Sequence, residues 1–213
     1  RENKLLAIAE DEDKQKNYRK RLGSLSWLMK CINEPIAKQS NKEDFVKGHF
    51  FESRFSSQAL LDEAAALTCM AYVDLNPIRA GITDKLELSS HTSIQKRLAE
   101  MTEAQLDDAI TAVAGKVRQR TMTIKLKDYI ELVEWTGKSI VHPNKASIPP
   151  HIASTLTRLN LRQDNWLSQV QRYGSNYSSV IGCLESIMER AKKMNKKWLK
   201  GVSQIKALYL NPD

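Results

Sequence analysis

Residues 62–82 read DEAAALTCMAYVDLNPIRAGI, and this stretch predicts more about the fold than any other part of the chain. Its first half is dominated by alanine, leucine and methionine, which favour helix. Asp62 can accept hydrogen bonds from the first free backbone N–H groups, as an N-cap does. Pro77 disfavours helix at the residue before it, and Gly81 suits a turn. We therefore predict a helix over residues 62–76, followed by a turn.

Two segments before this helix have different patterns. Apolar side chains recur at three- and four-residue steps from Tyr18 to Ile36, which indicates an amphipathic helix with a kink at Pro35. Residues 48–61 read GHFFESRFSSQALL, where aromatic and polar side chains nearly alternate. That alternation is typical of a strand or a short hairpin arm. We therefore expect one or two strands over residues 48–60.

The remainder of the chain predicts short helices. Thr102 and Gln105 have the spacing of a capping box, and a linker carries Pro143, Pro149 and Pro150. The expected helices cover residues 93–101, 102 onward, 126–135, 163–173 and 183–199. The fold class that follows is α+β and predominantly helical, with a first domain over residues 1–90 and a helical second domain, which could bind DNA, over residues 91–213.

Composition excludes several classes of protein. The chain has 213 residues, 41% hydrophobic and 27% charged, which is enough apolar material for a core and is not a disordered composition. No apolar run approaches the roughly 20 residues that cross a membrane, and no signal peptide opens the chain. Three widely spaced cysteines without a CxxC pair favour a reducing compartment. We therefore expect a cytoplasmic protein that makes no use of a membrane.

The net charge of +8 and the pI of about 9.3 favour polyanionic partners such as DNA, RNA or anionic lipid. Charge alone does not select among these partners. The first residue is Arg1 rather than methionine, so we expect this chain to be part of a longer protein.

Tyr72 and Asn76 are four residues apart and therefore share one face of the predicted helix. A tyrosine can attack phosphorus and hold a covalent phosphotyrosine, and an amide oxygen is a hard ligand suited to Mg²⁺. Spacing alone favours a plainer interpretation, with a hydrogen-bonded tyrosine and an asparagine that stops the helix before proline. The chemistry therefore needs support from further residues.

Three motifs within residues 26–82 supply that support. They are the G-x-F-x-E-x-R-F segment GHFFESRF, the segment SQALLDEAA, and a Y-x-x-x-N-P-x-R-A-G block that contains Tyr72, Asn76 and Arg79. Together they resemble the bacterial REP-associated tyrosine transposases, which belong to the single-tyrosine HUH superfamily. KLKDYIELVEWTGKSI at residues 125–140 and the C-terminal KKWLKG are similar to the longer members of that group.

The resemblance implies a function and a fold. Tyr72 falls on the family's nucleophile, and Asn76 falls on a helix position that helps to bind Mg²⁺ or Mn²⁺. Family members cut single-stranded, hairpin-bearing DNA through a 5′-phosphotyrosine, and so mobilise DNA elements by transposition and recombination. Residues 1–90 would be the C-terminal part of the HUH endonuclease domain, with a remnant of its small antiparallel palm sheet. A bacterial, nucleoid-associated homodimer is implied as well.

One departure from the family concerns its two name-giving histidines, which flank a hydrophobic residue and bind the metal. This chain contains no H-x-H, and its four histidines are His49, His91, His142 and His151. We therefore expect the histidine pair to precede Arg1 and the 213 residues alone to be inactive.

Basic residues extend the predicted DNA contacts beyond the motifs. Arg54 and Arg79 can bind phosphate with their guanidinium groups, and His49 is a candidate for contact with DNA or with the core. Arg54 could instead pair with Glu52 or Glu63. The last predicted helix ends in a basic run around Trp198 that suits phosphate contact and base stacking, or is a solvated face with Trp198 in the core. The basic residues of that run are Arg190, Lys192, Lys193, Lys196, Lys197 and Lys200.

Three hypotheses follow from the sequence. The first is a metal-dependent DNA strand transferase with Tyr72 as nucleophile. The second is a truncated or domesticated relative that binds DNA without cutting it. The third is a basic helical scaffold with no role on DNA.

Overall fold

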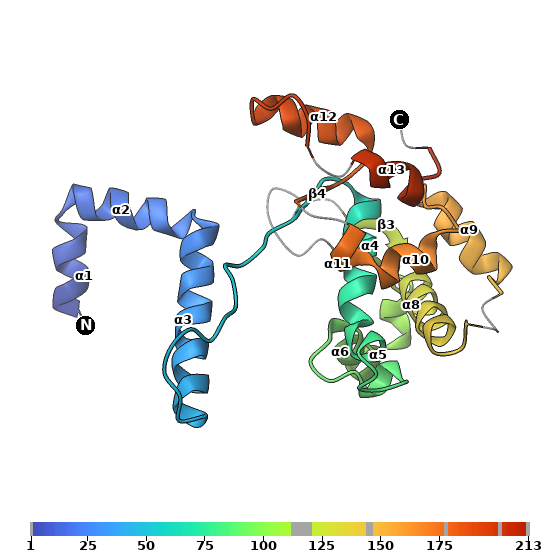
Figure 1. Ribbon diagram of the computed structural model, residues 1–213, viewed down its shortest axis with the longest axis horizontal. Helices are drawn as coiled ribbons and strands as arrows, with labels where there is room; N and C mark the ends of the chain where they lie inside the picture. Colours follow the sequence, from blue (N-terminus) through green and yellow to red (C-terminus); the bar gives the residue numbers. More distant parts are fainter. Residues whose placement is uncertain (1, 112–120, 144–146, 177–178, 200–201, 212–213) are drawn as a thin grey trace. The chain divides into compact units, whose positions relative to one another are not determined.

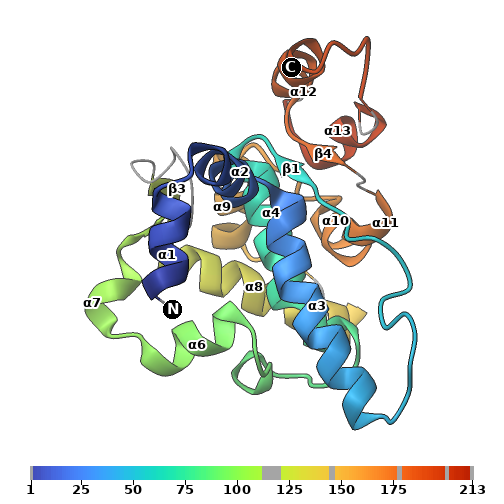
Figure 2. The ribbon, with the colours of Figure 1, turned by 90° about the vertical axis from the view of Figure 1, so that its left-hand side faces the viewer.

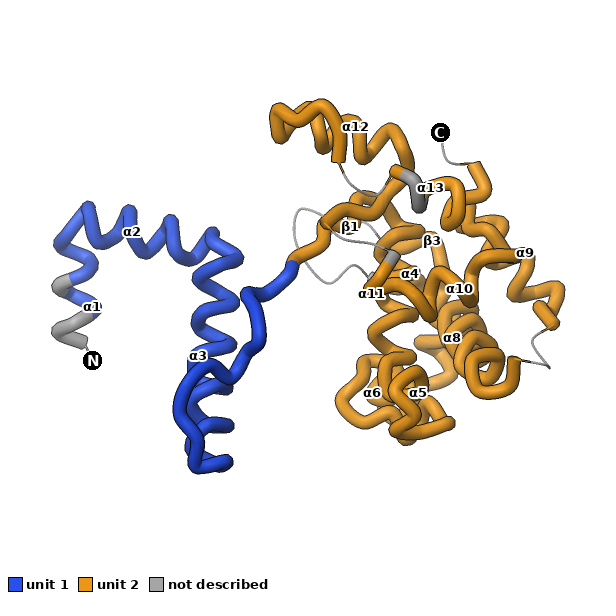
Figure 3. The backbone as a smooth tube through the Cα atoms, viewed as in Figure 1, with its two compact units in different colours: residues 1–56 blue, residues 57–213 orange. Residues whose placement is uncertain are grey.

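The computed structural model describes residues 2–111, 121–143, 147–176, 179–199 and 202–211 (Figure 1). The chain divides into two compact units, residues 1–56 and residues 57–213 (Figure 3). The sequence led us to expect a division between residues 90 and 91. Residues 57–90 instead pack with the later residues, because the helix that carries Tyr72 lies inside the hydrophobic core of the second unit.

The first unit consists of three successive helices, α1 (Glu2–Ala9), α2 (Glu12–Leu22) and α3 (Leu25–Glu43). Asp11 caps α2 by accepting a hydrogen bond of 2.9 Å from the backbone N–H of Lys14. The expected amphipathic helix is split between α2 and α3, with the break at Gly23 and Ser24. The later of these continues past Pro35 to Glu43, beyond the expected end. Neither α2 nor α3 contains a buried residue.

The aromatic segment of the first unit is not a strand. Residues 48–58 adopt neither strand nor helix, so the expectation of a strand or hairpin arm is wrong for them. An isolated strand leaves its backbone groups without partners, and no described residue pairs with this segment in a sheet. The only strand in the expected region is β1 (Ala59–Leu60), which lies in the second unit.

The second unit holds the remaining elements around one core (Figures 1 and 2). Its helices and strands after β1 are α4 (Glu63–Asp74), α5 (Asn76–Arg79), the 3₁₀ turn η1 (Leu86–Leu88), α6 (Ser93–Glu100), α7 (Glu103–Leu106), β2 (Ala109–Thr111), β3 (Thr121–Lys125), α8 (Leu126–Val141), α9 (Pro150–Arg158), α10 (Trp166–Gln171), α11 (Tyr173–Asn176), β4 (Val180–Ile181), α12 (Leu184–Lys193) and α13 (Val202–Leu208). The expected α+β class with helices dominating is confirmed.

Two small sheets connect distant parts of the second unit. β1 pairs with β4 in parallel, with Ala59 opposite Val180, and β2 pairs with β3 antiparallel. The antiparallel sheet expected over residues 48–60 is therefore not what β1 forms, since its partner comes from far along the chain and runs in the same direction. Strand pairing of this kind depends on contacts between distant residues, which local alternation does not encode.

Central helices of the second unit pack against one another. α10 contacts both α4 and α8, and the buried Trp166 donates a hydrogen bond of 2.9 Å from its indole Nε1 to Thr136 Oγ1. The helix expected over residues 126–135 continues past Gly137 to Val141 as α8. A Cβ at Gly137 would lie 3.1 Å from Leu75 Cδ2, so this glycine allows α5 and α8 to approach closely.

Asp62 begins α4 as expected, and it also ties that helix to the C-terminal part of the unit. Its carboxylate accepts from the backbone N–H of Ala65 (2.8 Å), the backbone N–H of Cys183 (2.7 Å) and the Tyr209 hydroxyl (2.7 Å). The cap therefore serves a second purpose that the sequence did not indicate, because it joins α4 to the chain after β4.

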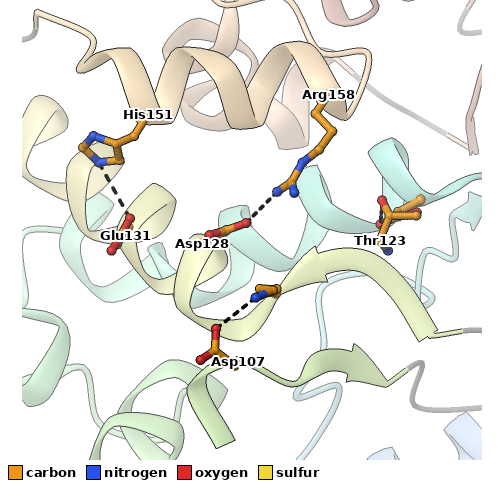
Figure 4. Close-up of polar contacts among 8 residues, drawn as sticks. Asp107, Thr123, Asp128, Glu131, His151 and Arg158 are labelled. Atoms are coloured by element: carbon orange, nitrogen blue, oxygen red, sulfur yellow. Dashed lines mark hydrogen bonds and ion pairs between the residues drawn. The ribbon is translucent and has the colours of Figure 1, made fainter. Parts of the chain in front are cut away.

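Polar side chains on the outside of α8 and β3 link neighbouring elements (Figure 4). Arg158 of α9 pairs with Asp128 at 2.6 Å, His151 lies 3.7 Å from Glu131, and Lys125 pairs with Asp107 at 2.9 Å. These contacts are largely exposed, so their contribution to stability is small. They leave His151 at the surface as a partner of α8.

None of the helices in the described part of the chain is both long and apolar enough to cross a lipid bilayer.

Candidate functional site

Tyr72 lies near the end of α4, in the last turn before the chain changes direction. α4 ends at Asp74, Leu75 separates it from α5, and Pro77 occupies the first turn of α5, where its missing N–H costs no hydrogen bond. Asn76 therefore begins a new helix instead of continuing the helix of Tyr72. The shared helix face expected from their spacing is interrupted at Leu75.

The Tyr72 ring is half-buried and held on two sides. It stacks on Tyr173 with ring centroids 4.8 Å apart and an angle of 29° between the planes. The guanidinium carbon of Arg79 lies 4.3 Å from its centroid, which is within the range of a cation–π contact. A Cβ added at Gly174 would lie 3.1 Å from the Tyr72 hydroxyl oxygen. The ring is therefore positioned by α5 and α11 together.

The Tyr72 hydroxyl has no hydrogen-bond partner among the residues that the structure describes. This distinguishes it from the other tyrosines of the core: Tyr129 donates to Asp74, Tyr173 donates to Gln58, and Tyr209 donates to Asp62. A phenol that packs by its ring alone leaves its oxygen available to an external group. The plainer interpretation of Tyr72, with a bonded hydroxyl, is not what the described residues show.

Arg79 is partly committed to the fold. It donates a hydrogen bond of 2.7 Å from Nη2 to the backbone carbonyl of Gln171, which fixes the guanidinium beside the Tyr72 ring. A guanidinium carries five N–H donors, so one bond leaves others for a phosphate. The structure thus places Arg79 against Tyr72. The carbonyl that holds Arg79 there belongs to Gln171, 92 residues later in the sequence.

Asn76 is exposed, and its side chain makes no hydrogen bond to the described residues. The neighbouring carboxylate, Asp74, is buried and points away from it. Asp74 accepts from the Ser93 hydroxyl (2.7 Å), the backbone N–H of Ile94 (3.1 Å) and the Tyr129 hydroxyl (2.6 Å).

The described side chains around Tyr72 and Asn76 do not form a metal site. Within the described ranges, no three histidine, cysteine, aspartate or glutamate side chains lie together as a possible ligand group. Asn76 alone could supply one amide oxygen, and a hard divalent cation needs several oxygen ligands. Among the described residues around Tyr72, Asn76 is therefore the one candidate ligand for the predicted Mg²⁺ or Mn²⁺.

His49 and Arg54 lie together in the first unit, apart from the residues around Tyr72 in the sequence. Both line a cavity of about 1080 Å³ between α3 and residues 48–55, which also includes Lys30, Phe50 and Phe51. Both are exposed. Arg54 forms no ion pair with any described residue, and Glu63 instead accepts from Thr123. The alternative in which Arg54 pairs with Glu52, within the same unit, is therefore wrong.

The C-terminal basic residues lie on and after α12. Lys193 pairs with Glu189 at 2.5 Å, whereas Lys192, Lys196 and Lys197 line a cavity of about 920 Å³. Trp198 is 73% exposed, so the alternative that places it in the core is wrong. The expected helix over residues 183–199 ends at Lys193, and Lys200 lies outside the described residues.

Residues that position Tyr72 include two that sequence reasoning missed. Tyr173 was expected only as the end of the helix over residues 163–173, and nothing in the local spacing of Tyr173 and Gly174 points to Tyr72.

Comparison of the chain with family models, with curated proteins and with solved structures finds no match.

Proposed function

We propose that this chain is part of a single-tyrosine DNA strand transferase in which Tyr72 is the nucleophile. The Tyr72 oxygen would attack the phosphorus of a single-stranded DNA phosphodiester and lose its proton to solvent. The bond from phosphorus to the 3′ oxygen would break, and that oxygen would take up a proton and leave as a free 3′-hydroxyl. The 5′-phosphotyrosine keeps the phosphoester bond for later rejoining.

The observation that carries the proposal is the half-buried Tyr72 hydroxyl with no bond to a described residue, next to the fixed guanidinium of Arg79. A nucleophile must be free to reach its substrate, and a cation beside it favours a phosphate that carries negative charge. The remaining N–H groups of Arg79 can donate to a phosphate oxygen. Asn76, exposed one residue after the end cap of α4, is the further polar group at this edge.

The resemblance to the transposases supplies the substrate, the metal ion, the oligomeric state and the cellular location that we propose. The substrate is single-stranded DNA with a hairpin, the divalent cation is Mg²⁺ or Mn²⁺, and the active protein is a homodimer on the bacterial nucleoid in the cytoplasm. His49 and Arg54 would contact DNA from the first unit, since both are exposed and line one cavity with Lys30.

A second candidate function is DNA binding without cleavage. The observation that favours it is the packing of Tyr72, whose ring is held between Tyr173 and Arg79 as a structural tyrosine would be. In that case the same basic residues would bind DNA, and Tyr72 would only join α4 to α11.

The test incubates the full-length protein with hairpin-bearing single-stranded DNA and Mg²⁺ or Mn²⁺, and then looks for a protein–DNA adduct that survives denaturing electrophoresis. We expect an adduct with the wild type and none with Tyr72→Phe, which keeps the stacked ring but removes the oxygen. Tyr18→Phe is the matched control, because Tyr18 is an exposed tyrosine of the first unit, and it should form the adduct normally.

DNA binding, measured in parallel by fluorescence anisotropy, separates the two candidates. Binding without any adduct supports the second candidate. An adduct that persists in Tyr72→Phe excludes Tyr72 as the nucleophile, and the absence of both binding and adduct overturns both candidates. Arg79→Ala should lower the rate of adduct formation by about 100-fold or more, the size of effect seen when one positioned donor to a developing negative charge is removed.

A further inference from the structure

Trp198 is the most exposed tryptophan of the described chain, and it borders a concave apolar surface. The side chain is 73% exposed, in contrast to Trp166, which is fully buried. Beside it a cavity of about 920 Å³ is lined by Met188 and Val202, which are 63% and 42% exposed. Burial of exposed apolar surface is favourable, so a ligand that covers the Trp198 ring would gain free energy from this contact.

The rim of this cavity is basic. Lys192, Lys196 and Lys197 all line it, and the described residues provide no ion-pair partner for any of the three. Lys193, one position along, is neutralised by Glu189, and Glu185 is the other acidic residue of the lining. The three unpaired ammonium groups therefore favour an anionic occupant.

The apolar side chains of α12 that line the cavity differ in exposure. Ile187 and Ala191 also belong to the core and are only 2% and 5% exposed, whereas Met188 is 63% exposed. What remains outside is a hollow with one flat aromatic ring at its edge instead of a continuous apolar stripe along the helix. A bilayer favours a long apolar helix face, whereas a hollow beside an aromatic ring and cations suits a planar ring attached to a phosphate.

We propose that the surface formed by α12 and residues 194–199 is a base-stacking site for single-stranded nucleic acid. Trp198 stacks on an unpaired base, and Lys192, Lys196 and Lys197 contact the flanking phosphates. Base–aromatic stacking tolerates any sequence because every base has a π-face. The inference rests on the proposed function, which is cleavage of single-stranded DNA. It adds a second contact with that DNA, at a site far from Tyr72 in the sequence.

The experiment measures binding of a fluorescein-labelled dT12 oligonucleotide to the full chain by anisotropy. We expect Trp198→Ala to bind roughly 5- to 100-fold more weakly, the range for loss of one stacked base. Trp198→Phe should stay within about threefold of the wild type, since the ring is kept. Tryptophan emission should fall when dT12 is added to the wild type, and this fall should be much smaller in Trp198→Phe.

Lysine variants test the charged rim. Lys196→Ala should lower the magnitude of the slope of log affinity against log salt concentration by about 0.7, as expected for one lost phosphate contact on a single strand. Lys127→Ala is the matched control, because Lys127 is an exposed lysine of α8 outside the cavity, and its slope should equal that of the wild type.

Three outcomes would overturn the inference. Unchanged dT12 affinity in Trp198→Ala excludes stacking, while the proposed function survives if the wild type still binds. A wild type that binds no dT12 overturns the proposed function together with this inference. Phosphatidylglycerol vesicles that bind the wild type but not Trp198→Ala, with dT12 binding equal in both, would identify the surface as a membrane contact instead.

Discussion

The hydrogen bond between Tyr129 and Asp74 links the helix of the candidate site to α8 through two buried side chains. Tyr129 is fully buried and donates to Asp74 at 2.6 Å. Burial, together with the neighbouring Asp74 carboxylate, raises the pKa of the Tyr129 phenol well above its ordinary value. The proton therefore stays on the phenol in the folded chain under conditions where an exposed tyrosine would lose it.

This shift gives stability a dependence on alkaline pH. Above pH of about 10 the unfolded chain releases the Tyr129 proton while the folded chain keeps it, so the free energy of unfolding falls as the pH rises. One such proton corresponds to about 1.4 kcal/mol per pH unit. We expect Tyr129→Phe to be less stable than wild type at pH 7 by about 1–3 kcal/mol, with a shallower loss between pH 10 and 11. Urea unfolding at several pH values measures both, and equal alkaline slopes would contradict the assignment.

Gly182 permits the close approach of β4 to the segment that leads into α4. A Cβ at this position would lie 2.7 Å from Leu61 Cβ, an atom that cannot move without the backbone. We expect Gly182→Ala to destabilise the chain by about 1–3 kcal/mol in urea unfolding. A Cβ at Gly174 would meet only the far end of the Tyr72 side chain, with the hydroxyl oxygen at 3.1 Å, so Gly174→Ala should cost less. A larger loss in Gly174→Ala would show that the Tyr72 ring cannot shift.

At the scale of the elements, the N-cap of α4 has partners both inside and outside its own helix. Asp62 accepts from Ala65 within its own helix, and from Cys183 and Tyr209 in the later chain. We expect Asp62→Ala to lower the free energy of unfolding by about 2–4 kcal/mol, from loss of the cap and of acceptors for partly buried donors. Thr92→Ala removes the cap of α6, which accepts only from Gln95, and should cost about 1 kcal/mol. Equal losses in the two variants would mean that the long-range bonds of Asp62 contribute nothing.

For the molecule as a whole, the hydrophobic core determines which part can fold alone. The buried cluster begins at Ala64 and ends at Tyr209, all within the second unit, whereas α2 and α3 contain no buried residue. We expect residues 57–213 to unfold cooperatively on heating, with a midpoint close to that of the whole chain. Residues 1–56 alone should melt gradually, since helices without tertiary packing are marginal in water. Circular dichroism of the two fragments measures this, and a sharp transition in residues 1–56 would contradict it.

Local sequence signals predicted part of the candidate site. Tyr72, Asn76 and Arg79 all came from one block of ten residues, and the structure places Arg79 against the Tyr72 ring. The helix face expected to carry both Tyr72 and Asn76 is interrupted, because α4 ends at Asp74 and α5 begins at Asn76, with Leu75 between them. Val73 of α4 is 54% exposed, whereas Leu67 of the same helix is fully buried. Helical periodicity identifies a face of a helix, but it does not say how wide the covered part of that face is.

Features that depend on neighbours within a few residues could be predicted from the amino-acid sequence. The start of α4 at Asp62, the capping box of Thr102 and Gln105, and the dominance of helix are of this kind, because a cap or a helical turn is complete within four residues. Tertiary structure alone decided that β1 pairs with β4, that Tyr173 stacks on Tyr72, and that Trp198 stays outside the core. Each of these depends on which distant segments bury their apolar surface together, and local spacing carries no record of that choice.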